Sequence, residues 1–253
     1  IMGRKITIEP VTRVEGHGKV TIQLDPQNNV TDSRLHIVEF RGFERFVQGR
    51  PYWEAPVLVQ RLCGICPVSH HLAAAKALDV IVGVGPDGLT PTGEKMRRLM
   101  HYGQTFQSHA LHFFHLVSPD LLFGIDSDPA TRNVIGVAME HPDLAVQGVM
   151  MRKFGQEIIR ATAGKKIHGT GAIPGGINKN LSIEERDEFL KGADPLNIDK
   201  MIEWSQGALD FFKDFHSKNS DMLDNFAAFP SNHLSLVRKD GALDLYQIGR
   251  AHV

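Results

Sequence analysis

The hydrophobic pattern of this chain changes its period near Gly42, and that change limits the possible fold more than any other feature. Before it, apolar residues alternate with polar ones, as in half-buried strands. The alternating apolar residues are Ile6, Ile8, Val20, Ile22, Leu24, Leu35 and Ile37. The Asp-Pro-Gln-Asn-Asn cluster at 25–29 predicts a turn between the last two runs. After Gly42 the spacing becomes helical, so the sequence predicts a mainly α chain with a small N-terminal antiparallel β-sheet (α+β).

The helical part is expected to contain several long segments joined by loops. Helices are predicted over 55–62, 70–82, 92–116, 142–162 and 199–223. Ser182 and Glu185 match a capping box, which predicts a further helix starting there. Loops are expected at 126–129 and in the Gly-rich stretch 164–180, and a hairpin is expected over 234–245 around Asp240-Gly241.

Composition excludes some classes of protein. The chain has 253 residues, which suggests roughly one or two domains. Its formal net charge of −1 gives no electrostatic case for binding nucleic acid or an anionic membrane. The longest apolar run, 78–84, is interrupted by Asp79 and Gly83, so no membrane span is expected. We expect residues 1–247 to form part of one domain.

The chain has only two cysteines, Cys63 and Cys66, separated by two residues. Thiolates at this spacing can converge on one soft metal ion, and Gly64 is expected to let the backbone bend between them. Pro67 places Cys66 at the N-cap of a helix, where exposed N–H groups favour thiolate over thiol. His70 lies one turn further along and is expected to donate a hydrogen bond to a ligating sulfur.

Taken alone, this C-x-x-C pair is also compatible with other roles. It fits a thioredoxin-like redox pair, half of a zinc site, or cysteines without chemistry. A four-cysteine zinc site would need a second pair, but a two-cysteine, two-histidine site is compatible with the thirteen histidines. The stretch 83–88 matches G-x-G-x-x-G, yet the residues before it are predicted to be helical, so we reject a dinucleotide fingerprint.

The residues around the cysteines, Arg-x-Cys-Gly-x-Cys-x-x-x-His over 61–70, resemble the first cysteine motif of nickel–iron hydrogenase large subunits. Four further segments resemble motifs of the same family and follow in family order. They are 10–17 (Pro-Val-Thr-Arg-Val-Glu-Gly-His), 41–44 (Arg-Gly-Phe-Glu), 108–116 (Ser-His-Ala-Leu-His-Phe-Phe-His-Leu), and 164–168 with 174–176. The stretches 66–71 and 118–122 are similar to the bidirectional, NAD-linked cytoplasmic branch.

This resemblance implies a truncated hydrogenase large-subunit fold and a nickel–iron centre whose iron carries carbon monoxide and cyanide. The family oxidises H2 reversibly and heterolytically. By the match of motifs, Cys63 would be a terminal nickel ligand and Cys66 would bridge nickel and iron. Glu44 matches a ligand of a remote magnesium or similar divalent ion, which suits a hard oxygen donor.

Glu15 matches the family's proton-transfer glutamate, while Arg61 and His70 would border the cofactor. Each has a simpler interpretation. Glu15 is flanked by an arginine and a histidine and also fits an ordinary ion pair, Glu44 fits a solvated acid in the first turn of a helix, and Arg61 fits a pair with Glu54.

The resemblance also implies partners. Electrons would pass to a small subunit that holds iron–sulfur clusters, because two cysteines are too few for a four-cysteine cluster. In the NAD-linked branch, diaphorase subunits would bind NAD, and the enzyme would be cytoplasmic.

The chain departs from the family pattern in one important respect: the second cysteine pair is absent, and the family's large subunits are longer. The last six residues, 248–253, resemble one reading frame of a widely used sequencing adapter, so we expect an artificial tail on a fragment. We expect such a fragment to be inactive alone. Two other functions stay open: a non-catalytic member of a respiratory complex with a similar fold, which the two cysteines argue against, and a zinc-stabilised binding module.

Overall fold

The computed structural model describes residues 3–39, 41–85, 88–226, 228–232, 235–237 and 240–246, together with the backbone of 251–252. The chain divides into two compact units, Ile1–Gln48 and Gly49–Val253, and each is described by itself.

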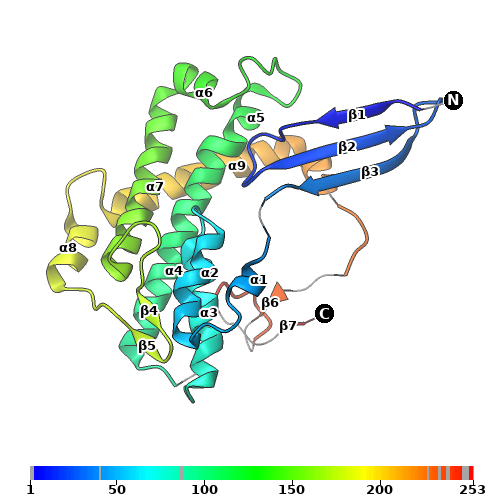
Figure 1. Ribbon diagram of the computed structural model, residues 1–253. Helices are drawn as coiled ribbons and strands as arrows, with labels where there is room; N and C mark the ends of the chain where they lie inside the picture. Colours follow the sequence, from blue (N-terminus) through cyan, green and yellow to red (C-terminus); the bar gives the residue numbers. More distant parts are fainter. Residues whose placement is uncertain are drawn as a thin grey trace. The chain divides into compact units, whose positions relative to one another are not determined.

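The first unit is the predicted antiparallel sheet, with the strand order β1-β2-β3 (Figure 1). Its strands are β1 (Lys5–Ile8), β2 (Gly18–Leu24) and β3 (Val30–Ile37). The turn at 25–29 forms because the Asp25 carboxylate accepts the N–H groups of Gln27 and Asn29, each at 2.8 Å. Asn28 takes a left-handed φ of 66° there, a conformation that asparagine tolerates. One helical turn, α1 (Phe43–Phe46), follows.

The second unit is helical, which confirms the predicted change of period. Its helices are α2 (Ala55–Val59), α3 (Pro67–Ile81), α4 (Pro91–Leu111), α5 (Ser118–Phe123), α6 (Val134–Glu140), α7 (Pro142–Ala163), α8 (Ile183–Lys191) and α9 (Ile198–Asn225). Short 3-10 turns at Tyr52–Glu54 and Gln60–Leu62 flank α2. The sequence did not predict α6, and the helix expected over 92–116 becomes a π-helix at His112–Val117. Helix α3 ends at Ile81, so the residues before the G-x-G-x-x-G stretch are helical, as predicted.

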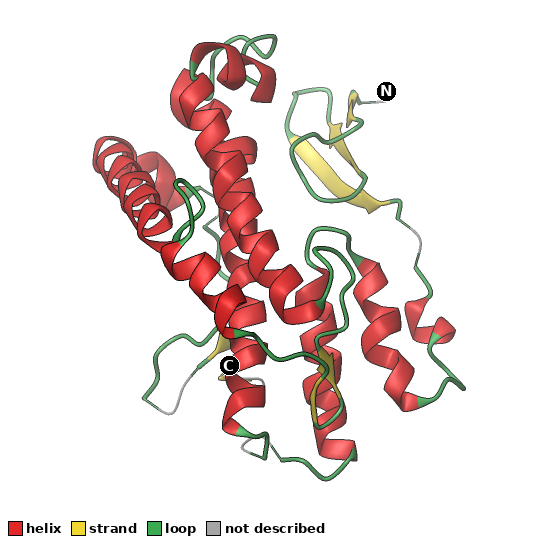
Figure 2. Ribbon diagram, turned by 90° about the vertical axis from the view of Figure 1, so that its left-hand side faces the viewer, coloured by secondary structure: helices red, strands yellow, loops and turns green. Residues whose placement is uncertain are grey.

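Helices α4 and α7 lie side by side (Figure 1). Figure 2, which is coloured by secondary structure, shows that most of the second unit is helical. Glycines allow their backbones to approach closely: a Cβ on Gly155 would lie 2.7 Å from both the Gln107 Cβ and the Gly103 carbonyl oxygen. Apolar side chains from α4, the π-helix, α7 and α9 fill the core beside this contact. They are Ala110, Phe114, Met151, Phe154 and Met201.

The stretch 164–180, expected to be an irregular loop, contains a short hairpin made of β4 (Ala172–Ile173) and β5 (Gly176–Ile177). Arg97 of α4 holds it in place. Its fully buried guanidinium pairs with Asp79 of α3 at 2.7 Å and donates to the carbonyl oxygens of Ile173 and Gly176. These partners are distant in sequence, so no local pattern indicates the hairpin.

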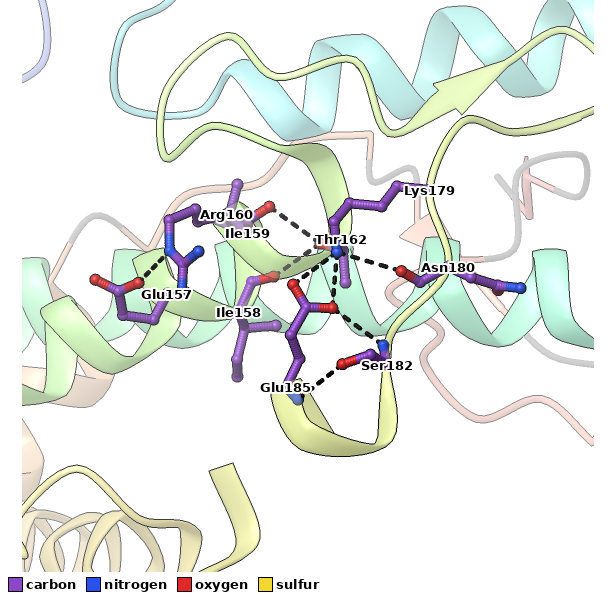
Figure 3. Close-up of polar contacts among 9 residues, drawn as sticks. All are labelled: Glu157, Ile158, Ile159, Arg160, Thr162, Lys179, Asn180, Ser182 and Glu185. Atoms are coloured by element: carbon purple, nitrogen blue, oxygen red, sulfur yellow. Dashed lines mark hydrogen bonds and ion pairs between the residues drawn. The ribbon is translucent and has the colours of Figure 1, made fainter. Parts of the chain in front are cut away.

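The capping box at the start of α8 is confirmed (Figure 3). The Ser182 hydroxyl oxygen accepts the Glu185 N–H at 3.1 Å, and the Glu185 carboxylate accepts the Ser182 N–H at 3.0 Å. Lys179 approaches the same carboxylate at 2.8 Å, so the first turn of this helix is tied to the preceding segment.

Near the C-terminal end, an antiparallel bridge between Val237 and Leu243 closes the predicted turn at Asp240-Gly241. Strand β6 (Ser235–Leu236), which comes before that turn, forms an antiparallel pair with β7 (Ala251–His252). Of the expected artificial tail, residues 248–250 and 253 lie outside the described residues. Among the helices that the structure describes, none combines the length and the apolar character needed to cross a membrane.

Candidate metal centre

The two cysteines lie on a tight loop between a 3-10 turn and helix α3. As predicted, Cys66 is the N-cap of α3 and Pro67 is its first residue. Cys63 is extended, with φ −144° and ψ 132°, and only 9% of it is exposed. Cys66 is half-buried. The loop therefore presents one sheltered sulfur and one more accessible sulfur at the beginning of a 15-residue helix.

The Cys63 sulfur accepts two backbone N–H groups of its own loop. The Ile65 nitrogen lies 3.4 Å and the Cys66 nitrogen 3.2 Å from Cys63 Sγ. N–H donors aimed at a sulfur favour its negative, metal-binding form over the neutral thiol. The Cys63 sulfur is thus held in place by two donors of its own loop.

The chain bends at Gly64, as expected, although Gly64 is not among the glycines with a positive φ. A Cβ built on Gly64 would meet no described atom within 4 Å. The described part of the chain therefore leaves the Gly64 side of the loop uncovered.

Two buried glutamines of α4, which were not predicted from the sequence, hold this loop through a backbone carbonyl group. The side-chain nitrogens of Gln104 and Gln107 each lie 3.0 Å from the Ile65 carbonyl oxygen. Both residues are only 3% exposed. The sequence feature that could have revealed them is the presence of two polar side chains, one helical turn apart, on a face of α4 that also carries the apolar Met100 and Ala110.

Next to the predicted His70, the structure fixes a second histidine, His71, by two backbone contacts. His71 is 1% exposed; its Nδ1 donates to the Pro56 carbonyl oxygen at 2.9 Å, and its Nε2 accepts the Ala172 N–H at 3.1 Å. Burial lowers the pKa of His71 below its ordinary value. His71 therefore ties α3 to both α2 and β4 as a neutral ring, while the neighbouring His70 is half-buried.

Arg61 lies just before the loop and is exposed, and its guanidinium donates to the Val57 carbonyl oxygen at 2.7 Å. The alternative partner considered for it, Glu54, instead approaches Arg50 at 3.9 Å. Arg61 therefore lies next to the cysteine loop, with its side chain directed back along α2.

The two predicted carboxylates belong to the first unit. Glu15 is exposed and lies between β1 and β2. Glu44 lies in the first turn of α1 with 75% of its side chain exposed, 3.8 Å from Arg41. The structure brings Cys63 and Cys66 together within the second unit, and the two carboxylates are described only within the first unit.

The two sulfurs are the strongest candidates for holding a metal. Thiolates suit nickel, iron and zinc better than magnesium or calcium. Among the residues that the structure describes, no three histidine, cysteine or acidic side chains gather as a metal-binding group. The donor set here therefore amounts to a pair.

Comparisons with known proteins agree with the motifs. A family model described as nickel-dependent hydrogenase matches residues 41–126, and one described as HoxL-like matches residues 5–40. The beta subunit of the NAD-reducing hydrogenase HoxS of Cupriavidus necator is 54% identical over 256 residues, which cover 100% of this chain and 52% of that protein. A chain of the F420-non-reducing hydrogenase of Methanothermobacter thermautotrophicus is 44% identical, over 96% of this chain and 50% of that protein.

Solved structures give the same result. A crystal structure of an NAD+-reducing NiFe-hydrogenase in the H2-reduced state matches with a TM-score of 0.89 and 57% identity, over 98% of this chain and 53% of that one. The reduced Ni-Fe-Se hydrogenase from D. vulgaris Hildenborough matches with a TM-score of 0.69 and 28% identity, over 87% of this chain and 46% of that one.

The chain spans about half the length of the relatives that it matches. Its identity is higher to the NAD-reducing relative than to the F420-non-reducing one, 54% against 44%, which agrees with the branch predicted from 66–71 and 118–122. The motifs, the family models and the shared fold lead to one conclusion: this chain belongs to the large-subunit family of nickel-dependent hydrogenases.

Proposed function

We propose that this chain is the N-terminal part of the catalytic subunit of a nickel–iron hydrogenase, with Cys63 and Cys66 as two of the four thiolate ligands of its metal centre. The observation that carries the proposal is the pair of N–H groups, at 3.2 and 3.4 Å, on the Cys63 sulfur. These contacts fix the direction in which the Cys63 sulfur faces on its loop.

The residues present fit half of that centre. Cys63 and Cys66 are soft donors on one rigid loop, and soft donors are what nickel and low-valent iron prefer. A second C-x-x-C pair would supply the other two thiolates. When bound, the centre, whose iron would carry carbon monoxide and cyanide, supplies the redox-active site at which H2 is split heterolytically.

The protein's own side chains would hold the centre and move the proton. Glu15 is proposed to take the proton and pass it on, since a carboxylate can bind and release a proton at low cost. Arg61 and His70 are proposed to border the centre. Glu44 is proposed as an oxygen ligand of a remote magnesium or similar divalent ion.

Electrons would have to leave through another protein chain. We propose a small subunit with iron–sulfur clusters and, by similarity to the NAD-reducing relative, diaphorase subunits that bind NAD. A cytoplasmic location stays a prediction that comes from the same resemblance.

The test uses the complete large subunit, recovered from the longer gene and produced with its small subunit. We expect H2-dependent reduction of a viologen dye in the parent protein and its loss in both Cys63→Ser and Cys66→Ser. Ser69→Ala, which changes a half-buried neighbour on the first turn of α3, is the matched control and should keep the activity.

Full activity in either cysteine variant, or a complete gene without a second C-x-x-C, would contradict the proposal. Tight binding of zinc alone to the two cysteines would instead favour the zinc-stabilised module. As isolated, the 253-residue chain alone is expected to lack an assembled nickel–iron centre, because it offers only two of the four thiols.

A further inference from the structure

We propose that Gln104 and Gln107 are positioning residues that fix the geometry of the Cys63–Cys66 loop through the carbonyl group of Ile65. The part of the proposal that concerns the position of the loop is supported by the hydrogen bonds to Ile65. The consequence for metal binding rests on the proposed function.

Gln104 and Gln107 contact the same backbone oxygen. The two side-chain nitrogens come from one face of α4, one turn apart, and both lie 3.0 Å from the same Ile65 oxygen. A carbonyl oxygen only accepts hydrogen bonds, so the NH2 end of each amide must face it. A carbonyl oxygen has two lone pairs, and the two glutamines therefore saturate it.

The Ile65 carbonyl group is also connected to the Cys63 sulfur. The Ile65 carbonyl shares a peptide unit with the Cys66 nitrogen, and that nitrogen donates to Cys63 Sγ at 3.2 Å. Hydrogen bonds in a chain polarise one another, so two donors on the oxygen strengthen the donor on the opposite side of the peptide. A continuous chain of bonds thus runs from α4, through one peptide, to the Cys63 sulfur.

Packing alone does not account for the presence of glutamine at these two buried positions. Both are 3% exposed, and within the described residues neither side-chain oxygen has a hydrogen-bond partner. Burying an unsatisfied acceptor is unfavourable, and an apolar side chain of similar length would avoid it. The favourable part of each amide is its contact with Ile65.

Helix packing adds rigidity to this support. Gln107 lies at the contact between α4 and α7. A Cβ built on Gly155 of α7 would lie only 2.7 Å from the Gln107 Cβ. The close contact of the two helices leaves Gln107 little room to move. One of the two side chains that hold the loop, Gln107, is therefore confined by α7.

The test replaces each glutamine by methionine, singly and together, which keeps the length of the side chain and removes the donors. Thr162→Val is the matched control: Thr162 is 1% exposed and donates to the Ile158 carbonyl oxygen at 2.8 Å within α7 (Figure 3). It removes a buried side-chain hydrogen bond of the same unit that lies within α7 and not on the Ile65 carbonyl. Each variant is compared with the parent chain in urea unfolding.

The first readout needs no metal: amide hydrogen exchange of the segment 61–66 in the 253-residue chain. We expect exchange at Ile65 and Cys66 to be about tenfold faster in Gln104→Met and Gln107→Met, and faster still in the double variant. Exchange there should be unchanged in Thr162→Val. The single variants each keep one bond, so they test the idea even if the double variant does not fold.

The second readout is a titration with Co2+, followed by the thiolate-to-cobalt charge-transfer absorption. Loss of a group that orients a ligand typically weakens metal binding about 10-fold to 100-fold, so about tenfold is expected for each single variant. Exchange at Ile65 and Cys66 that stays within about twofold of the parent, or rises equally in Thr162→Val, overturns the proposal.

The two readouts separate this proposal from the function on which it partly rests. Faster loop exchange in the glutamine variants, together with no charge-transfer band even in the parent chain, supports the positioning role and counts against metal binding by the cysteines. A strong band in every variant, with unaltered exchange, supports metal binding and overturns the positioning role.

Discussion

Replacing Asp79 by alanine should be among the most destabilising single changes in the second unit. The side chain of Arg97 is 0% exposed and that of Asp79 is 8% exposed, with 2.7 and 3.0 Å between their paired atoms. Without the carboxylate, the guanidinium loses its charged partner and keeps the neutral carbonyl oxygens of Ile173 and Gly176. Leaving one partner of a buried ion pair alone costs about 3–5 kcal/mol.

A second loss places Asp79→Ala toward the upper end of that range. The Gly175 N–H donates to the Asp79 carboxylate at 2.7 Å and would also lose its acceptor. Against a total stability of about 5–15 kcal/mol, this is a large fraction. The assay is urea unfolding followed by tryptophan fluorescence from Trp53 and Trp204, and the midpoint should fall by about 2 M.

Two comparisons isolate the buried charge. Asp214→Ala removes a pair with Lys218 whose side chains are 62% and 69% exposed, and it should leave the midpoint unchanged. Asp79→Leu combined with Arg97→Met removes both charges and should be less destabilised than Asp79→Ala alone. A loss below about 1 kcal/mol in Asp79→Ala, or a double variant less stable than the single one, would refute the reasoning.

Three further predictions follow from other contacts. Because burial lowers the folded-state pKa of His71 below 6.5, the unfolded chain takes up a proton first, and stability should fall as the pH drops from about 6.5. His71→Phe should remove that part of the slope; a pH-independent stability difference between the two proteins would disprove it. Gly155→Ala places a Cβ 2.7 Å from the Gln107 Cβ and should lower the free energy of unfolding by about 1–3 kcal/mol, measured by urea unfolding. Gly207→Ala, whose Cβ meets nothing within 4 Å, is the control and should not destabilise the chain. Equal effects of the two changes would contradict the close contact of α4 and α7. Ser182→Ala should cost about 0.5–2 kcal/mol and speed amide exchange in the first turn of α8, and unchanged exchange would argue against the cap.

The elements that the sequence predicted correctly are those with local signals. Alternation fixed the three strands, and the spacing of Ser182 and Glu185 located the start of α8. The order Cys66-Pro67 placed the start of α3, because an N-cap and a proline at the first position act within a few residues.

The features that the sequence did not reveal depend on which faces meet in the folded chain. His70 and His71 differ by about 100° around a helix, and only the packing of α3 against α2 and β4 decides that His71 is the buried one. Gln104 lies 39 residues from Ile65 in sequence, so its contact with the cysteine loop has no local signature. The β4–β5 hairpin depends in the same way on Arg97, 76 residues before Ile173.

The most direct test of the central claim is nickel K-edge X-ray absorption of the 253-residue chain with one equivalent of Ni2+. If Cys63 and Cys66 are one half of a thiolate centre, the fine structure should show two sulfur neighbours, one in each single cysteine-to-serine variant and none in the double variant. A spectrum with only nitrogen and oxygen neighbours, identical in the parent chain and the double variant, would contradict the claim.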